Sequence, residues 1–71
     1  MWNYEDLSVI ATYLEVPVRG KVRLSRITYG GIVTHHVVLS EAIVMPWNGE
    51  VKEAGTVVIV DHDCIEEIFG G

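Results

Sequence analysis

The sequence predicts a mostly β fold, in which a short N-terminal helix precedes five strongly bent antiparallel strands that form a small barrel. Three observations lead to this prediction. Apolar and polar residues alternate over residues 16–24, as in a half-buried strand. Gly30 and Gly31 stand together in an apolar stretch, where paired glycines indicate a sharp bend. Beyond Pro17 no helical crossover is visible, so the strands should be antiparallel.

Residues 4–14 are expected to form the helix. Asn3 is a good N-cap, and Glu5 and Asp6 suit the positive end of a helix dipole. Apolar residues then repeat with the spacing of one helix face, at Leu7, Ile10, Ala11 and Leu14. Pro17 ends the helix, because the residue before a proline disfavours the helical conformation. The helix should cover an open end of the strands.

The first strand, residues 16–24, should bury one face and expose the other. Small or apolar residues occupy the core face, namely Val18, Gly20, Val22 and Leu24. Cations occupy the opposite face, namely Arg19, Lys21 and Arg23. The alternation slips at Ser25, where Arg26 takes the parity that had been apolar. A bulge or tight turn is therefore expected, with a chain reversal at residues 24–27.

Four further strands are expected, at residues 27–34, 37–45, 56–60 and 64–69. The second strand should curl at its glycine pair, and the third should be central because it is apolar on both faces. Residues 50–54 should form the outer part of a hairpin, and residues 61–63 a short acidic turn. A sandwich would need more strands, so the barrel types of SH3, OB and Sm proteins are the candidates.

The composition indicates one small domain that gains stability from association. A chain of 71 residues buries a limited core, and its 49% apolar content is high for a small monomer. Lone Cys64 cannot form an intramolecular disulfide, so oligomerisation is the remaining common way for such a small domain to gain stability. No apolar run is long enough to span a membrane, and the N-terminus does not resemble a secretory signal, so a cytoplasmic protein is expected.

Three stretches resemble the two motifs of the Sm/LSm family, including its bacterial Hfq branch, over about residues 4–69. KVRLSRITYGGIV and HHVVLSEA are similar to the first Sm motif, with its alternating strand, bent glycine strand and apolar third strand. VVIVDHDCIEEI at 57–68 is similar to the second motif, an apolar strand, a turn and a short apolar strand. His36 stands where the family has its base-contacting Asn, and residues 61–63 stand in place of the Arg-Gly-Asp turn.

The resemblance implies a non-enzymatic protein that binds single-stranded RNA or DNA as a homo-oligomeric ring. It implies contact between subunits through the strands at 56–60 and 64–69, and no cofactor. The positions that the resemblance offers for RNA contact at the second motif are Asp61, His62 and Asp63. Asp61 replaces the family's arginine, and the loop between Ile32 and Val37 is shorter than the family's.

The candidate nucleic-acid site also includes a basic stripe and several rings, inferred from the residues themselves. The basic stripe consists of Arg19, Lys21, Arg23 and Arg26, in a chain whose formal net charge is −5. These cations suit phosphate, although a solvated face that discourages edge aggregation would look the same. Tyr29, His35 and His36 can stack on bases, although a turn also tolerates histidines. Adjacent strand residues face opposite sides, so only one histidine can line a given surface.

The sequence gives less support to a metal site or a catalytic site. Asp61, His62, Asp63 and Cys64 could join a further His in a mixed metal site, but they lack a recognised ligand spacing, so no metal is predicted. The only candidate for a nucleophile activated by a base is Cys64 with a histidine, and no enzyme is predicted. The alternative to nucleic-acid binding is a protein–protein interaction or structural module of the same small fold. Burial of the basic stripe against a neighbour's acids would favour that alternative.

Overall fold

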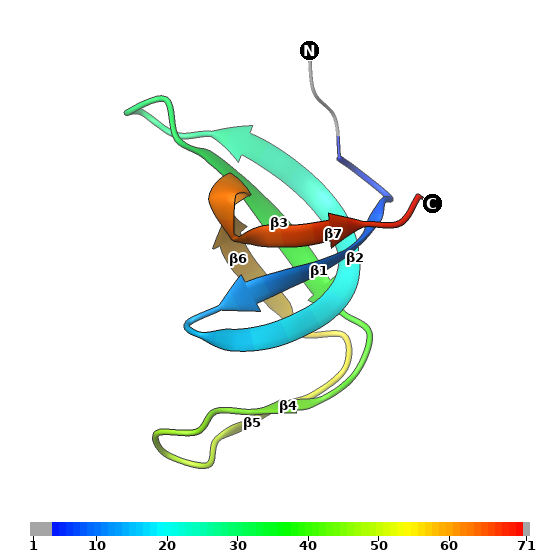
Figure 1. Ribbon diagram of the computed structural model, residues 1–71, viewed down its shortest axis with the longest axis vertical. Coiled ribbons are helices and arrows are strands. Elements are labelled where there is room, and N and C mark those ends of the chain that lie inside the picture. Colours follow the sequence, from blue (N-terminus) through cyan, green and yellow to red (C-terminus); the bar gives the residue numbers. More distant parts are fainter. Residues whose placement is uncertain (1–3, 71) are drawn as a thin grey trace.

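The computed structural model describes residues 4–70, and it shows one strongly curled antiparallel sheet of five strands (Figure 1). The strand order in this sheet is β6-β3-β2-β1-β7. The bounds of its strands are β1 Ser8–Tyr13, β2 Val16–Ile27, β3 Val33–Leu39, β6 Val57–Asp61 and β7 Ile65–Ile68. A separate hairpin pairs β4 (Ile43–Val44) with β5 (Val51–Lys52), and a single 3-10 turn, η1 (His62–Cys64), joins β6 to β7. The prediction of a small, mostly β, antiparallel fold is confirmed.

The predicted helix at residues 4–14 is wrong, because this stretch contains β1. Val9 and Ala11 point into the core with the two-residue period of a strand. The same residues fit both patterns, but β-branched and aromatic side chains favour the strand. β1 also pairs on both sides, with β2 and with β7. Asn3, the expected N-cap, lies outside the described residues.

No helix within residues 4–70 is long and apolar enough to cross a membrane.

A tight hairpin joins β1 to β2. Tyr13 pairs with Val16, so Leu14 and Glu15 alone form the loop, and both have positive φ, 48° and 67°. Two positive φ angles are the mark of a type I′ turn, which matches the right-handed twist of the strands. Asn and Gly are the usual residues there, so Leu-Glu gives no turn signal in the sequence.

β2 continues through the predicted reversal at residues 24–27, so that prediction is wrong. The slip in alternation is absorbed by a bulge, seen as a register shift between Val22 and Leu24 in the pairing with β3. The chain reverses later, where Thr28 N–H donates to the Ile32 carbonyl at 2.7 Å. The glycine pair lies in this turn, with Gly31 at φ 82°. The separate second strand at 27–34 is therefore wrong.

The predicted third strand at 37–45 is also wrong in its extent. β3 ends at Leu39, and the chain then leaves the sheet to form the β4–β5 hairpin, which projects from the body of the protein (Figure 1). β3 is buried on alternate residues only, and the central strand of the sheet is β2. β6 and β7 fall within about a residue of the strands expected at 56–60 and 64–69.

The sheet does not close into a barrel, so this part of the predicted fold class is wrong. β6 and β7 form the two edges of the sheet and are not paired with each other. The curl is sharpest along β2, which lies so close to its partner strand β3 at Gly20 that an added Cβ would lie 2.1 Å from the Val38 carbonyl oxygen. The bulge after Val22 adds to the bend, because bulges increase local twist.

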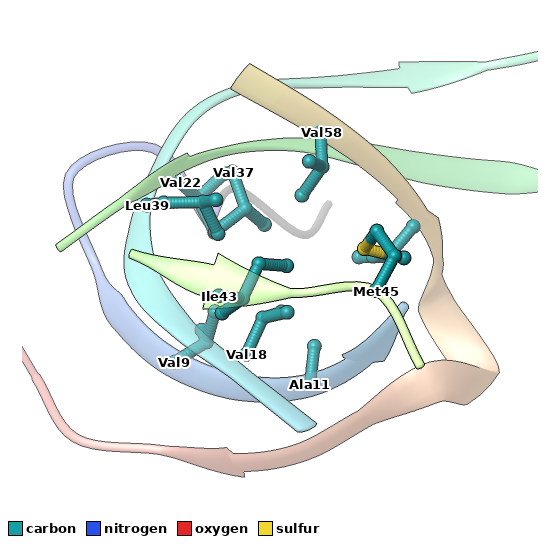
Figure 2. Packing of buried hydrophobic residues seen from close by; sticks show 10 residues of the cluster. Val9, Ala11, Val18, Val22, Val37, Leu39, Ile43, Met45 and Val58 are labelled. Atoms are coloured by element: carbon teal, nitrogen blue, oxygen red, sulfur yellow. The ribbon is translucent and has the colours of Figure 1, made fainter. Parts of the chain in front are cut away.

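The core lies inside the curl and consists mainly of valines from four strands, with two residues from the hairpin (Figure 2). Ile43 and Met45 point inward from β4 and its end, between the walls of the curled sheet. They cover the open side that the predicted helix was expected to cover. The other buried apolar residues are Val9, Ala11, Val18, Val22, Val37, Leu39, Val58 and Val60.

Gly20→Ala should destabilise the protein strongly, because the new methyl group meets backbone and not a movable side chain. We expect a loss of about 1–3 kcal/mol or more in the free energy of unfolding, measured by urea denaturation. Gly30→Ala is the matched control, since no atom lies within 4 Å of the position that its new methyl group would take. It should change stability by less than about 0.5 kcal/mol. Equal midpoints for the two variants would show that the close approach of β2 to β3 tolerates a side chain.

Candidate functional site

The candidate site residues fall into two regions of the sheet. The basic stripe lies on the outer face, whereas His35 lies on the inner face and packs with His62 of η1. Tyr29 lies apart from both, in the exposed turn between β2 and β3. The outer region therefore offers charge to solvent, and the inner region is a small polar cluster at the end of the core.

The basic stripe is set by the alternation of β2. Arg19 and Lys21 alternate with buried Val18, Gly20 and Val22, so both cations point outward and are exposed. Beyond the bulge, even-numbered residues face outward in place of odd-numbered ones. Ser25 therefore lies on the inner face, where it contacts His35, and its neighbours Leu24 and Arg26 lie on the outer face. Arg23, within the bulge, is also exposed. The cations at 19, 21 and 23 are exposed on one strand, as expected, and the same strand also carries exposed Arg26, which was expected in a chain reversal.

Among residues 4–70, no stripe cation forms a salt bridge, although Glu41 lines a hollow with Arg19, and Asp6 lines another with Lys21 and Arg23. The salt bridge found there joins Lys52 to Glu50 at 3.6 Å, on the β5 side of the molecule. Arg19 instead lies over the ring of Phe69, with 5.8 Å between the guanidinium carbon and the ring centroid. Open hollows border the stripe, one of about 400 Å³ beside Arg19 and Lys21. An anion that binds the stripe would therefore displace no salt bridge among the described residues.

The two adjacent histidines face opposite sides, as expected. His36 pairs with Leu24 on one side and Ile59 on the other, on the outer face. His35 is fully buried, with 0% of its surface exposed. Asp61 pairs with Thr34, which pairs with Arg26, so a carboxylate lies two strands from the last cation of the stripe. Asp63 is exposed on η1.

His35 is the centre of a short hydrogen-bonded chain. Its Nδ1 lies 2.6 Å from the Ser25 hydroxyl, and its Nε2 lies 3.0 Å from Nδ1 of His62. The ring of Tyr4 packs against both imidazoles, with centroid distances of 4.8 and 5.3 Å. A neutral His35 satisfies both contacts with one proton, since Ser25 and His62 can each donate or accept. The chain extends from the half-buried Ser25 to the exposed His62.

Burial determines the charge state of His35. Loss of solvent lowers the pKa of His35 below the ordinary value of 6.5, and the neighbouring His62 lowers it further. At neutral pH His35 is therefore uncharged, which suits its place beside the apolar core. This pKa shift is a stability effect, because the unfolded chain takes up the proton more readily than the folded one.

A hydroxyl beside an imidazole is the elementary unit of nucleophilic catalysis. Here the base is buried, so its ring has no surface with which to meet a substrate. The Ser25–His35–His62 chain therefore satisfies polar groups inside the fold and orients η1. Within residues 4–70, no group of three or more His, Cys, Asp or Glu residues gathers closely enough to hold a metal ion.

The sequence does not indicate three of these contacts. In the sequence Ser25 marks only the place where alternation slips, although that slip is what turns its hydroxyl toward His35. Tyr4 belongs to the predicted helix, and Phe69 ends the last predicted strand. The contacts join residues as far apart as 35 and 62, or 19 and 69, so no local pattern could reveal them.

Acid should destabilise the protein through His35. Because folding lowers its pKa, the stabilisation is complete above about pH 6.5 and is lost as the pH falls below that value. One proton contributes at most about 1.4 kcal/mol per pH unit to the slope of stability against pH. Urea midpoints between about pH 7.5 and pH 5 measure that slope.

His35→Gln should flatten this slope, whereas His36→Gln, its neighbour on the opposite face, should leave it close to that of the wild type. A slope that is unchanged in His35→Gln would assign the acid sensitivity to other groups.

A related protein should share two features of this chain. These are a histidine buried at the end of the core and an exposed basic stripe on β2. The chain matches no family model, no curated protein and no solved structure. Its function is therefore inferred from the residues and their geometry.

Proposed function

We propose that this protein is not an enzyme and that it binds single-stranded RNA or DNA through the basic stripe of β2. In this proposal it acts as a homo-oligomeric ring, with a role in RNA or DNA processing in the cytoplasm. Free Cys64 suits a reducing compartment. The proposal is built on the outer face of the sheet, which carries both the cations and exposed apolar residues.

One observation supports the binding proposal above the others. Four of the chain's five Lys and Arg residues lie on one strand, β2, with their side chains exposed, although the chain as a whole carries a net charge of −5. A chain that repels phosphate overall binds it only where cations are focused, and repetition around an oligomer multiplies such a site. His36 on the same face adds a ring that can stack on a base.

Single strands fit this face better than a duplex. The cations follow one strand of the sheet, with aromatic and apolar side chains beside them, and unpaired bases need such surfaces for stacking. Few phosphates would be neutralised by one subunit, so the logarithm of affinity should fall gently with the logarithm of salt concentration.

The oligomer proposal is based on the two sheet edges. β6 and β7 are edge strands, and an unpaired edge is a template for pairing with another chain. The outer side of β6 exposes Val57 and Ile59, the latter 54% exposed. Pairing of β6 in one subunit with β7 in the next is heterologous, and such contacts close into a ring when the rotation permits.

The second candidate function is a protein–protein interaction module without nucleic-acid binding. The observation in its favour is the β4–β5 hairpin, which projects from the sheet (Figure 1) and exposes Val44, Trp47 and Val51. Exposed apolar groups on a projecting hairpin suit a protein partner. In that case the cations of the stripe would contact a neighbour's carboxylates and not phosphate.

Charge reversal on the stripe should abolish binding. We expect wild-type protein to bind fluorescein-labelled oligo-U or oligo-dT at low salt, and Arg19→Glu/Arg23→Glu to bind at least about tenfold more weakly in fluorescence anisotropy. The slope of affinity against salt should fall by about 0.7 for each phosphate that the variant no longer neutralises.

A matched pair of single variants separates the stripe from net charge. Arg23→Glu and Lys52→Glu change the charge equally, but Lys52 lies on β5, outside the stripe, and already pairs with Glu50. Equal losses for both variants, or no wild-type binding at low salt, would favour the interaction module.

Ile59→Asp should reduce the assembly to smaller species, because it places a charge on the outer side of an edge strand. The side chain is exposed, so folding should survive the change. Native mass spectrometry and sedimentation of wild type and variant measure the assembly directly.

Ile27→Asp is the control, since Ile27 is similarly exposed but lies on the central strand β2. A wild-type protein that sediments as a monomer at micromolar concentration would contradict the ring.

A further inference from the structure

Phe69 extends the outer face of the sheet next to the basic stripe. Its backbone N–H donates to the Ser8 carbonyl at 2.7 Å, which continues the β1–β7 pairing by one residue. Ser8 pairs in turn with Lys21 of β2. One row across three strands therefore runs from Phe69 through Ser8 to Lys21. The small serine leaves an open space between the aromatic ring and the ammonium group.

The neighbouring cation completes this arrangement. Arg19 lies over Phe69, 5.8 Å from the ring centroid, and yet the phenylalanine remains 45% exposed. Ser40 is held beside Arg19, because its hydroxyl and its N–H both donate to the Arg19 carbonyl, at 3.0 and 2.9 Å. These side chains surround the hollow of about 400 Å³, lined by Ser8, Arg19, Gly20, Lys21, Ser40, Phe69 and Gly70.

We propose that this hollow is a subsite for a single nucleotide of the bound strand, with the base stacked on Phe69 and its phosphate held by Lys21 and Arg19. The proposal rests on the proposed function and assigns a residue, Phe69, that the basic stripe does not include. An aromatic ring beside two cations is the pairing that single-stranded nucleic acids require, since every base has a flat face and every nucleotide a charge.

The charges around the hollow set the direction of the nucleotide. Glu67 pairs with Ile10, which pairs with Arg19, so a carboxylate lies in the next row on the β7 side. The phosphate is therefore placed over β2, away from Glu67, between the two cations of the hollow, while Asp6 lines a separate hollow on the other side of Lys21. The base lies over β7 at the Phe69 end, where the side chain is uncharged. Across the row, two strand spacings of about 4.8 Å each separate the ring from Lys21.

The test compares two labelled oligonucleotides of equal length, oligo-dT and an oligomer of abasic sites, which have the same phosphates but differ in bases. Phe69→Leu keeps an apolar side chain and removes the ring. It should weaken binding of oligo-dT by about 5- to 100-fold in fluorescence anisotropy and leave the abasic oligomer unchanged. Phe69→Trp should restore binding of oligo-dT. Trp47→Leu, at an aromatic residue 54% exposed on the β4–β5 side, should have no effect.

The outcomes separate this subsite from the proposed function. If wild type binds oligo-dT and Phe69→Leu binds it equally well, the subsite is wrong and the basic stripe stands. Equal losses on both oligomers would overturn stacking, because the ring would then act only by holding Arg19. If wild type binds neither oligomer, both proposals fail.

A second variant is available if circular dichroism shows that Phe69→Leu does not fold. Ser8→Leu fills the space between the ring and Lys21 and leaves both side chains in place. It should also weaken binding of oligo-dT selectively. Unchanged binding in folded Ser8→Leu would show that no base enters the hollow.

Discussion

The close approach of β2 to its partner strand β3 at Gly20 is the constraint on which the rest of the structure depends. Only a residue without a side chain allows the Val38 carbonyl to lie where it does. At this approach β2 bends and brings its two neighbours around a core made mainly of valines. Such a core is small, and four strands, β1, β2, β3 and β6, supply it with alternate residues.

The same strand connects the fold to the proposed function. The inner face of β2 supplies core residues, and the outer face consequently gathers nearly all the positive charge of an acidic chain. The bulge after Val22 then changes which residues face outward. It keeps Arg26 on the charged side and turns Ser25 toward His35. One backbone irregularity therefore extends the basic stripe and also satisfies a buried histidine.

The polar cluster at the end of the core illustrates how a small fold accommodates a buried ionisable group. His35 is neutral because burial lowers its pKa, and its two ring nitrogens have Ser25 and His62 as partners. Its contact with His62 also holds η1, the turn between the two edge strands, against β3. The cluster lies inside the sheet and the cations lie outside it, so the stabilising cluster and the surface proposed for binding occupy opposite faces of the same sheet.

The sequence alone determined the β class, the antiparallel pairing, the position of both edge strands and the exposure of the basic stripe. These features follow from two-residue alternation, which a strand shows locally. The tertiary structure decided that residues 8–13 form a strand, because their pattern fits both periods and pairing with β2 and β7 settles it. Only the fold could bring Ser25, His35 and His62 into contact, or place Phe69 beside Arg19, since these contacts link distant segments. The tertiary structure also decided that the sheet stays open. Closure depends on whether the bending of β2 brings the edge strands β6 and β7 together around the core, and no single stretch of sequence encodes that bending.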